Sequence, residues 1–139
     1  MNYLKKTIKY LVAFFILIVA IKVADNSERP NITLSDTDKI TLCKSYIANI
    51  FHRQPSVYSH YKTDEEGLIY VRFIRPNDGT LWVNRCKITS ENMLWSTYLK
   101  DDKKWGRWRV EDKANLTEYE PNRAEYEIIK WDLKVKVNL

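Results

Sequence analysis

Few residues in this chain could do catalytic chemistry. A nucleophile needs a base beside it, and the imidazoles available are His52 and His60. His52 is expected at the end of a helix and His60 in a Ser-His-Tyr run, where a capping or surface role is the simpler interpretation. The metalloprotease, nucleophile-elbow, phosphate-loop and Cys-x-x-Cys motifs do not occur. We therefore expect a protein that is not an enzyme and needs no cofactor.

One run of carboxylates, Asp64-Glu65-Glu66, precedes Gly67. Such a run could bind calcium or supply an acid and base pair for hydrolysis. It lacks the alternating ligands of a calcium loop, so a solvated turn is the preferred interpretation. We expect no metal site, and a carboxylate-based hydrolase is the least favoured function.

Arginines and tryptophans are interleaved through the second half of the chain. The set comprises Arg72, Arg75, Arg85, Arg107 and Arg109 with Trp82, Trp95, Trp105 and Trp108. Guanidinium groups and aromatic faces together can hold phosphate, carboxylate or sugar groups. Strand alternation would put Trp82 and Arg85 on opposite faces, so tryptophans in the core and arginines paired with acids outside form the alternative.

Within this set the candidate binding residues are Arg85, Trp105, Arg107 and Arg109. Arg75 is a weaker candidate because it and Asp78 can hold their own turn.

The two cysteines offer covalent rather than catalytic chemistry. Cys43 lies on the apolar stripe of an expected helix, and Cys86 shares a strand face with Trp82 and Ile88. If the helix packs on that face, the thiols can approach each other. Two buried free thiols are the alternative, but a bridge is favoured in an exported protein.

The first 24 residues indicate export. Lys5, Lys6 and Lys9 precede an unbroken apolar run over 11–21, which is typical of a signal peptide. The run is short for a membrane span of roughly 20 residues, so a cleaved signal peptide and a transmembrane anchor both stay open. No cysteine follows the run, which argues against a lipid anchor. We expect an inner-membrane protein with a periplasmic domain, or a secreted periplasmic one.

The remaining chain is expected to form one domain. Residues 25–34 form a linker and 35–139 an exported domain, since about 115 residues are too few for two cores. Four of the 23 basic residues and none of the 18 acidic ones lie in the leader, leaving 19 basic against 18 acidic. This balance gives no reason to expect a nucleic-acid partner.

A single long helix is predicted from Asp36 to His52. Ser35 and Asp38 resemble a capping box, Pro55 follows the helix, and apolar residues recur at spacings of three and four. These stripe residues are Ile40, Cys43, Ile47, Ile50 and Phe51.

Strands are predicted for the rest. The ranges are 68–74, 80–88, 92–98, 105–110, 116–120 and a last strand over 129–137, with a hairpin turn at 75–79 and a loop at 100–104. In the last strand Ile129, Trp131, Leu133, Val135 and Val137 would share the buried face. The expected fold class is α+β: a membrane or signal helix, then one amphipathic helix packed on an antiparallel sheet of about four to six strands.

Several of these segments resemble a family of small exported bacterial and prophage-encoded proteins, often labelled uncharacterised or putative lipoproteins. The resemblance covers about residues 40–120 and rests on the helix around Cys43, the Arg-Pro-Asn-Asp-Gly-Thr-Leu-Trp string at 75–82 and the Arg-Cys pair at 85–86. It implies a helix on an antiparallel sheet with the cysteines bridged, and it implies no established activity.

The leading functional prediction is a non-enzymatic module that binds another envelope protein, of phage, plasmid or secretion origin. The alternative is an envelope domain that binds an anionic ligand or glycan through the arginine and tryptophan residues.

Overall fold

The structure is a computed structural model that describes residues 33–139, so the predicted leader and most of the predicted linker lie outside it. It contains one long helix, α2 (Asp36–Ile50), and three 3-10 turns, η1 (Pro55–Val57), η2 (Val110–Asp112) and η3 (Ile129–Trp131). The strands are β1 (Ser59–Thr63), β2 (Ile69–Ile74), β3 (Leu81–Ile88), β4 (Asn92–Leu99), β5 (Lys104–Trp105), β6 (Ala114–Glu120), β7 (Arg123–Ile128) and β8 (Leu133–Asn138).

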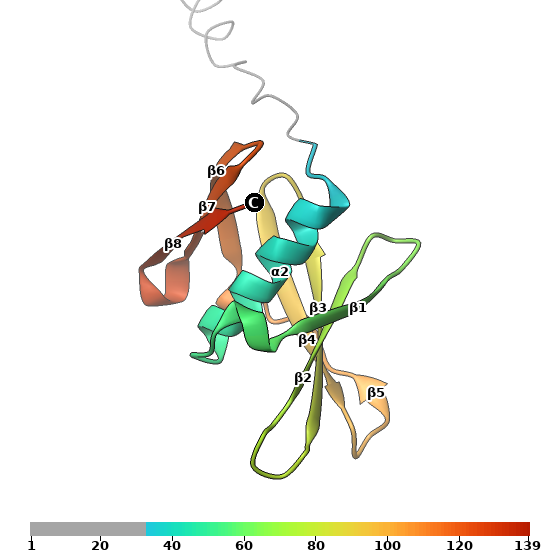
Figure 1. Cartoon of the computed structure of the whole chain (residues 1–139). Coiled ribbons are helices and arrows are strands. Elements are labelled where there is room, and N and C mark those ends of the chain that lie inside the picture. The colour runs from blue at the N-terminus through green and yellow to red at the C-terminus, as the bar shows by residue number, and fades with distance from the viewer. Residues whose placement is uncertain (1–32) are drawn as a thin grey trace, which may run out of the picture. The chain divides into compact units, whose positions relative to one another are not determined.

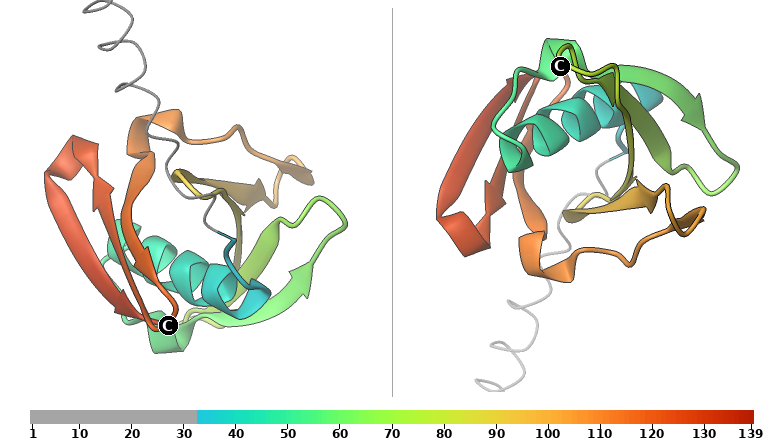
Figure 2. Two further views of the ribbon diagram at one scale, coloured as in Figure 1. Left: turned by 90° about the horizontal axis from the view of Figure 1, so that it is seen from above. Right: turned by 90° about the horizontal axis from the view of Figure 1, so that it is seen from below.

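The strands form one antiparallel sheet in the order β1-β2-β3-β4-β6-β7-β8, with β5 paired to β4. The ladder between β4 and β6 has only two residue pairs, Asn92 with Asn115 and Met93 with Ala114. The sheet curls around α2, which lies in its hollow (Figures 1 and 2). The α+β class is confirmed, with eight strands rather than four to six. None of the helices within residues 33–139 is long and apolar enough to cross a membrane.

Both ends of α2 follow from local chemistry. The predicted capping box is confirmed: Asp38 donates its backbone N–H to the Ser35 hydroxyl at 3.1 Å, and Ser35 donates its own to the Asp38 carboxylate at 3.2 Å. The helix ends at Ile50, two residues before the predicted end, because His52 adopts a positive φ of 52°. Arg53 then donates its N–H to the Ala48 carbonyl, which completes a Schellman-type end.

A disulfide joins Cys43 of α2 to Cys86 of β3, with a Cα–Cα distance of 5.8 Å. The preferred prediction is therefore confirmed, and the free-thiol alternative is wrong. Both residues are fully buried. The bridge fixes the helix to the β2 and β3 side of the sheet.

The other side of α2 is also covered, which the predicted single stripe did not include. Tyr46 is fully buried; its ring packs edge to face on Tyr126 of β7, and its hydroxyl donates to the Asp112 carbonyl at 2.6 Å. The Tyr126 hydroxyl is hydrogen-bonded to Ser45 and accepts from Asn49. The curl of the sheet therefore gives the helix two walls.

The strand predicted over 105–110 is wrong. Only Lys104 and Trp105 pair as a strand, and the chain then turns into η2. Gly106 donates its N–H to the Thr97 carbonyl and Arg109 to that of Trp95. The two donors, Gly106 and Arg109, are three residues apart, whereas their acceptors are two residues apart on β4. This mismatch breaks the regular ladder.

The single strand predicted over 129–137 is also wrong, because a turn lies inside it. Ile129 begins η3, and Asp132 adopts a left-handed φ of 49° before β8 starts. Asp tolerates this conformation better than most residues. Ile129 is consequently 58% exposed and Trp131 is 38% exposed, whereas Val137 is buried as predicted.

The predicted strands at 68–74, 80–88, 92–98 and 116–120 are confirmed within two residues, as is the turn at 75–79. Two strands were missed. All five residues of β1 are exposed, so it has no apolar alternation to detect. In β7, Ala124, Tyr126 and Ile128 do alternate as buried residues between polar ones.

The buried phenol of Tyr126 predicts alkaline destabilisation. Burial raises the pKa of Tyr126 to about 12, although its hydrogen bonds to Ser45 and Asn49 lower it. Below pH 10 Tyr126 keeps its proton in both the folded and the unfolded state, so its titration does not lower the free energy of unfolding. Between pH 10 and about 12 the unfolded state loses its proton first, so stability falls as pH rises, by on the order of 3 kcal/mol.

Urea unfolding at pH 9 and pH 11.5 measures this loss. The Tyr126→Phe variant should lose less stability over the same interval. An equal loss in both proteins would contradict the assignment to Tyr126.

Candidate functional site

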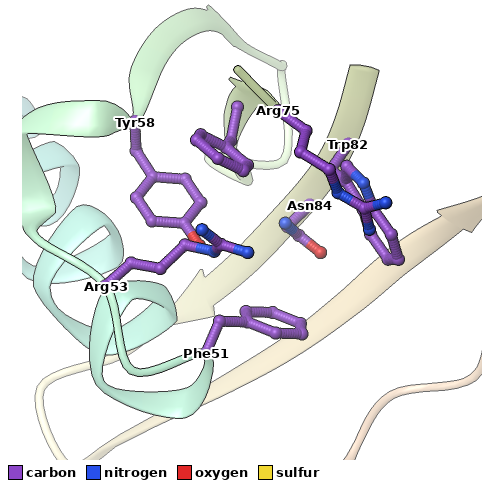
Figure 3. A pocket seen from close by; sticks show the side chains of 7 residues that line it. Phe51, Arg53, Tyr58, Arg75, Trp82 and Asn84 are labelled. Atoms are coloured by element: carbon purple, nitrogen blue, oxygen red, sulfur yellow. The ribbon is translucent and has the colours of Figure 1, made fainter. Parts of the chain in front are cut away.

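A pocket of about 220 Å³ lies beside the C-terminal end of α2. In this region β2 and β3 extend past the helix (Figure 1). It is lined by Phe51, Arg53, Tyr58, Phe73, Arg75, Trp82 and Asn84. Figure 3 shows Arg53 and Arg75 entering from different segments, with Asn84 between them in that view. The pocket is therefore walled by the end of the helix on one side and by two strands on the other.

Arg53 owes its position to the helix end. The left-handed His52 turns the chain, and the Arg53 guanidinium carbon lies 4.4 Å from the centroid of the Phe73 ring. Arg53 forms no ion pair with any of the residues 33–139. A guanidinium that stacks on a ring keeps its N–H donors along the edge of its plane. Those donors are available to a ligand.

Arg75 is held more firmly. Its guanidinium carbon lies 5.2 Å from the centroid of the Trp82 ring, and its Nη1 donates to the Asp78 carboxylate at 3.0 Å. The pKa of Asp78 is lowered, first by the backbone N–H of Thr80 and also by Arg75. Asp78 therefore remains charged at neutral pH and competes with any anion for Arg75.

Asn84 supplies a polar atom that lacks a partner. The side chain is 1% exposed, and its Oδ1 accepts no hydrogen bond. A buried acceptor without a donor costs about 1–3 kcal/mol, and such atoms are rare in folded proteins. Because Asn84 lines the pocket, a bound ligand can supply the missing donor.

These features define the chemistry that the pocket can do. The two guanidiniums favour an oxyanion, and rings preset their orientation before the ligand arrives. The lining contains no carboxylate, histidine or thiol, and besides the guanidiniums its one ionisable side chain is the phenol of Tyr58, whose pKa burial raises. Binding is the chemistry that these groups support.

The predicted candidates lie elsewhere and form two groups. Arg85 lies between two tryptophans, with its guanidinium carbon 4.5 Å from the Trp105 ring centroid and 4.7 Å from that of Trp108. Tyr70 packs edge to face on Trp105 at 5.4 Å. We call Tyr70, Arg85, Trp105 and Trp108 the outer cluster, since β3 alternation places Arg85 on the face opposite Cys86.

Arg107 and Arg109 converge on Glu111 instead. Arg107 makes two hydrogen bonds to its carboxylate at 2.8 and 2.6 Å, and Arg109 approaches it at 3.5 Å. The Arg107 hydrogen bonds lower the pKa of Glu111 to about 2. Glu111 thus occupies the donors of Arg107. This arrangement agrees with the alternative interpretation of the sequence, in which the arginines pair with acids outside the core. None of the four predicted residues lines the pocket.

The other candidate groups have local roles. The Asp64 carboxylate accepts the N–H groups of Leu68 and Glu66 and the Tyr70 hydroxyl, so it holds its own turn as that interpretation predicts. His60 is exposed, and its imidazole forms a hydrogen bond with the Thr63 hydroxyl. Within residues 33–139, no three His, Cys, Asp or Glu side chains gather as a metal site would require.

Comparisons of this chain with models of protein families, with curated proteins and with solved structures find no match. The pocket therefore has to be interpreted from its own geometry.

Sequence reasoning named Arg75 and Trp82 but missed Phe51, Arg53, Tyr58 and Asn84 as site residues. Arg53 comes directly after the predicted helix, and no local pattern shows where its side chain lies. One signal was available in the sequence. Asn84 lies two residues before Cys86, so strand alternation places this polar residue on the same buried face.

Proposed function

We propose that this domain is a non-enzymatic binding module that takes a small anionic ligand, whose body packs against the aromatic walls of the pocket. One observation carries the proposal: two ring-stacked guanidiniums, Arg53 and Arg75, share a pocket with the buried, unpartnered oxygen of Asn84. Ligand pockets typically combine aromatic walls with a few fixed polar groups. The unpaired amide oxygen of Asn84 does not stabilise the fold. In a binding site the same oxygen can accept a hydrogen bond from the ligand.

The proposal places the domain in the bacterial envelope. The Cys43–Cys86 bridge supports an oxidising compartment, in agreement with the leader expected at 1–24. Attachment to the inner membrane and release into the periplasm after cleavage remain the two proposed forms. A tethered domain would meet envelope ligands at a high local concentration.

A titration of the full-length chain in detergent micelles tests the proposal. The probe is cyclohexanecarboxylate, and its uncharged isostere cyclohexanecarboxamide is the matched control. We expect saturable shifts of the Trp82 indole N–H signal with the acid, weaker at high salt, and none with the amide. Equal binding of both compounds would refute an anion site.

Variants locate the interaction. Arg53→Ala is expected to weaken binding of the acid by about ten- to a hundredfold, the range for a lost charged hydrogen bond. Asp78→Asn keeps an acceptor for the Thr80 N–H but removes the competing charge, so it should tighten binding. Arg123→Ala, whose partners Glu118 and Glu120 lie on another hairpin, is the control and should change nothing.

Binding of an envelope protein is the second candidate function. The observation that favours it is the outer cluster with its neighbour Tyr61, which is 42% exposed and 6.1 Å from Tyr70 between ring centroids. Aromatic and arginine side chains are enriched in protein interfaces. Capture of a specific envelope protein that Trp105→Ala abolishes and Arg53→Ala leaves unchanged would favour this function.

A further inference from the structure

We infer that the ligand of the pocket is a single acidic sugar unit, whose carboxylate meets the guanidiniums while a ring hydroxyl meets Asn84. This inference rests on the proposed function and names the ligand class of the same site. It follows from three properties of the lining: an unsatisfied amide, a partly open tryptophan and a small volume.

The unsatisfied amide sets the first requirement. A carboxylate is an acceptor only, so a simple carboxylic acid would bind the arginines and leave the Asn84 oxygen unpaired. The ligand must therefore carry a donor in addition to its charge. A hydroxyl both donates and accepts, so it can satisfy either end of the Asn84 amide, whereas a peptide N–H can satisfy only the oxygen.

The aromatic wall sets the second requirement. The Trp82 side chain remains 40% exposed although Arg75 lies over its ring, and Phe51 completes the apolar lining from the end of α2. Part of the indole is thus open to a ligand. A sugar ring presents a C–H face that can pack on an indole, with its hydroxyls around the rim.

The volume sets the third requirement. A cavity of about 220 Å³ corresponds to about seven waters and is smaller than the pockets that take drug-sized ligands. It therefore suits one ring with its substituents. A longer saccharide would present only one unit to this pocket.

Three titrations of the full-length chain test the inference, using glucuronate, glucose and cyclohexanecarboxylate. Glucose lacks the charge, and cyclohexanecarboxylate keeps ring and charge but lacks hydroxyls. We expect glucuronate to bind about tenfold more tightly than cyclohexanecarboxylate, as one satisfied buried acceptor predicts, and glucose to bind most weakly. In Asn84→Val the advantage of glucuronate over cyclohexanecarboxylate should disappear, because the acceptor that the sugar hydroxyl satisfies is gone.

Each other outcome has a definite meaning. If cyclohexanecarboxylate binds in an Arg53-dependent way and glucuronate binds no better, the sugar inference fails and the anion site stands. If neither acid binds, the proposed function fails as well. If trialanine with a free carboxylate binds more tightly than glucuronate, the ligand is a peptide terminus and the sugar inference is overturned.

Discussion

Replacing Cys43 and Cys86 together by alanine is expected to lower the free energy of unfolding by about 4 kcal/mol. The bridge closes a loop with a sequence separation of 43 residues, and the chain-entropy model gives this value for a loop of that length. A domain of this size is stable by only about 5–15 kcal/mol, so the loss is a large share. Urea unfolding with the two proteins side by side measures the difference.

Reduction of the unaltered chain is the matched control, because it removes the bridge without removing atoms from the core. Reduced protein and the double variant should both unfold at lower urea than the oxidised chain. Equal midpoints before and after reduction would mean that packing alone holds α2 on the sheet.

The double variant should also lose ligand affinity. Phe51 and Arg53 follow α2, whereas Trp82 and Asn84 belong to β3, and the disulfide is the covalent link between the two segments. Without it the two walls of the pocket can shift relative to each other. Binding that persists unchanged in the folded variant would show that noncovalent packing fixes the pocket.

The second large effect is expected at Asn84, where a substitution should stabilise the fold and weaken the binding of glucuronate. Asn84→Val removes a buried acceptor that has no partner and places a strand-favouring residue in β3. We expect the free energy of unfolding to rise by about 1 kcal/mol. Replacing a residue that is kept for function often stabilises a protein while it weakens the function.

Asn49→Ala is the control, since this asparagine is satisfied. Its amide donates to the Ser45 carbonyl at 2.9 Å and to the Tyr126 hydroxyl at 3.0 Å, so its loss should destabilise the protein. Thermal unfolding of both variants separates the cases. If Asn84→Val is the more destabilised of the two, Asn84 has a structural role and the case for a ligand-facing amide collapses.

The parts of the fold that sequence predicted are those encoded locally. The capping box needs only Ser35 and Asp38, and the turn at 75–79 needs its own proline and glycine. The disulfide required one step more, because a helix stripe and a strand face each placed one cysteine. Such features depend on residues close in sequence or on a single packing contact.

The missed features depend on distant residues. Alternation over 129–137 looks the same in a strand and in a turn followed by a strand, and Asp132 is what breaks it. The curl of the sheet, which buries Tyr46 as well as Cys43, arises from strand pairing that no short pattern records. The pocket was missed for the same reason, since it joins the end of α2 to two strands.

The most direct test of an anion pocket is the shift map of the full-length, oxidised chain titrated with cyclohexanecarboxylate. We predict saturable changes at the Trp82 indole N–H, the Asn84 side-chain amide and the Arg53 guanidinium, with the outer cluster unchanged. Shifts that stay linear with concentration, or that appear around Arg85, Trp105 and Trp108 instead, would contradict the account.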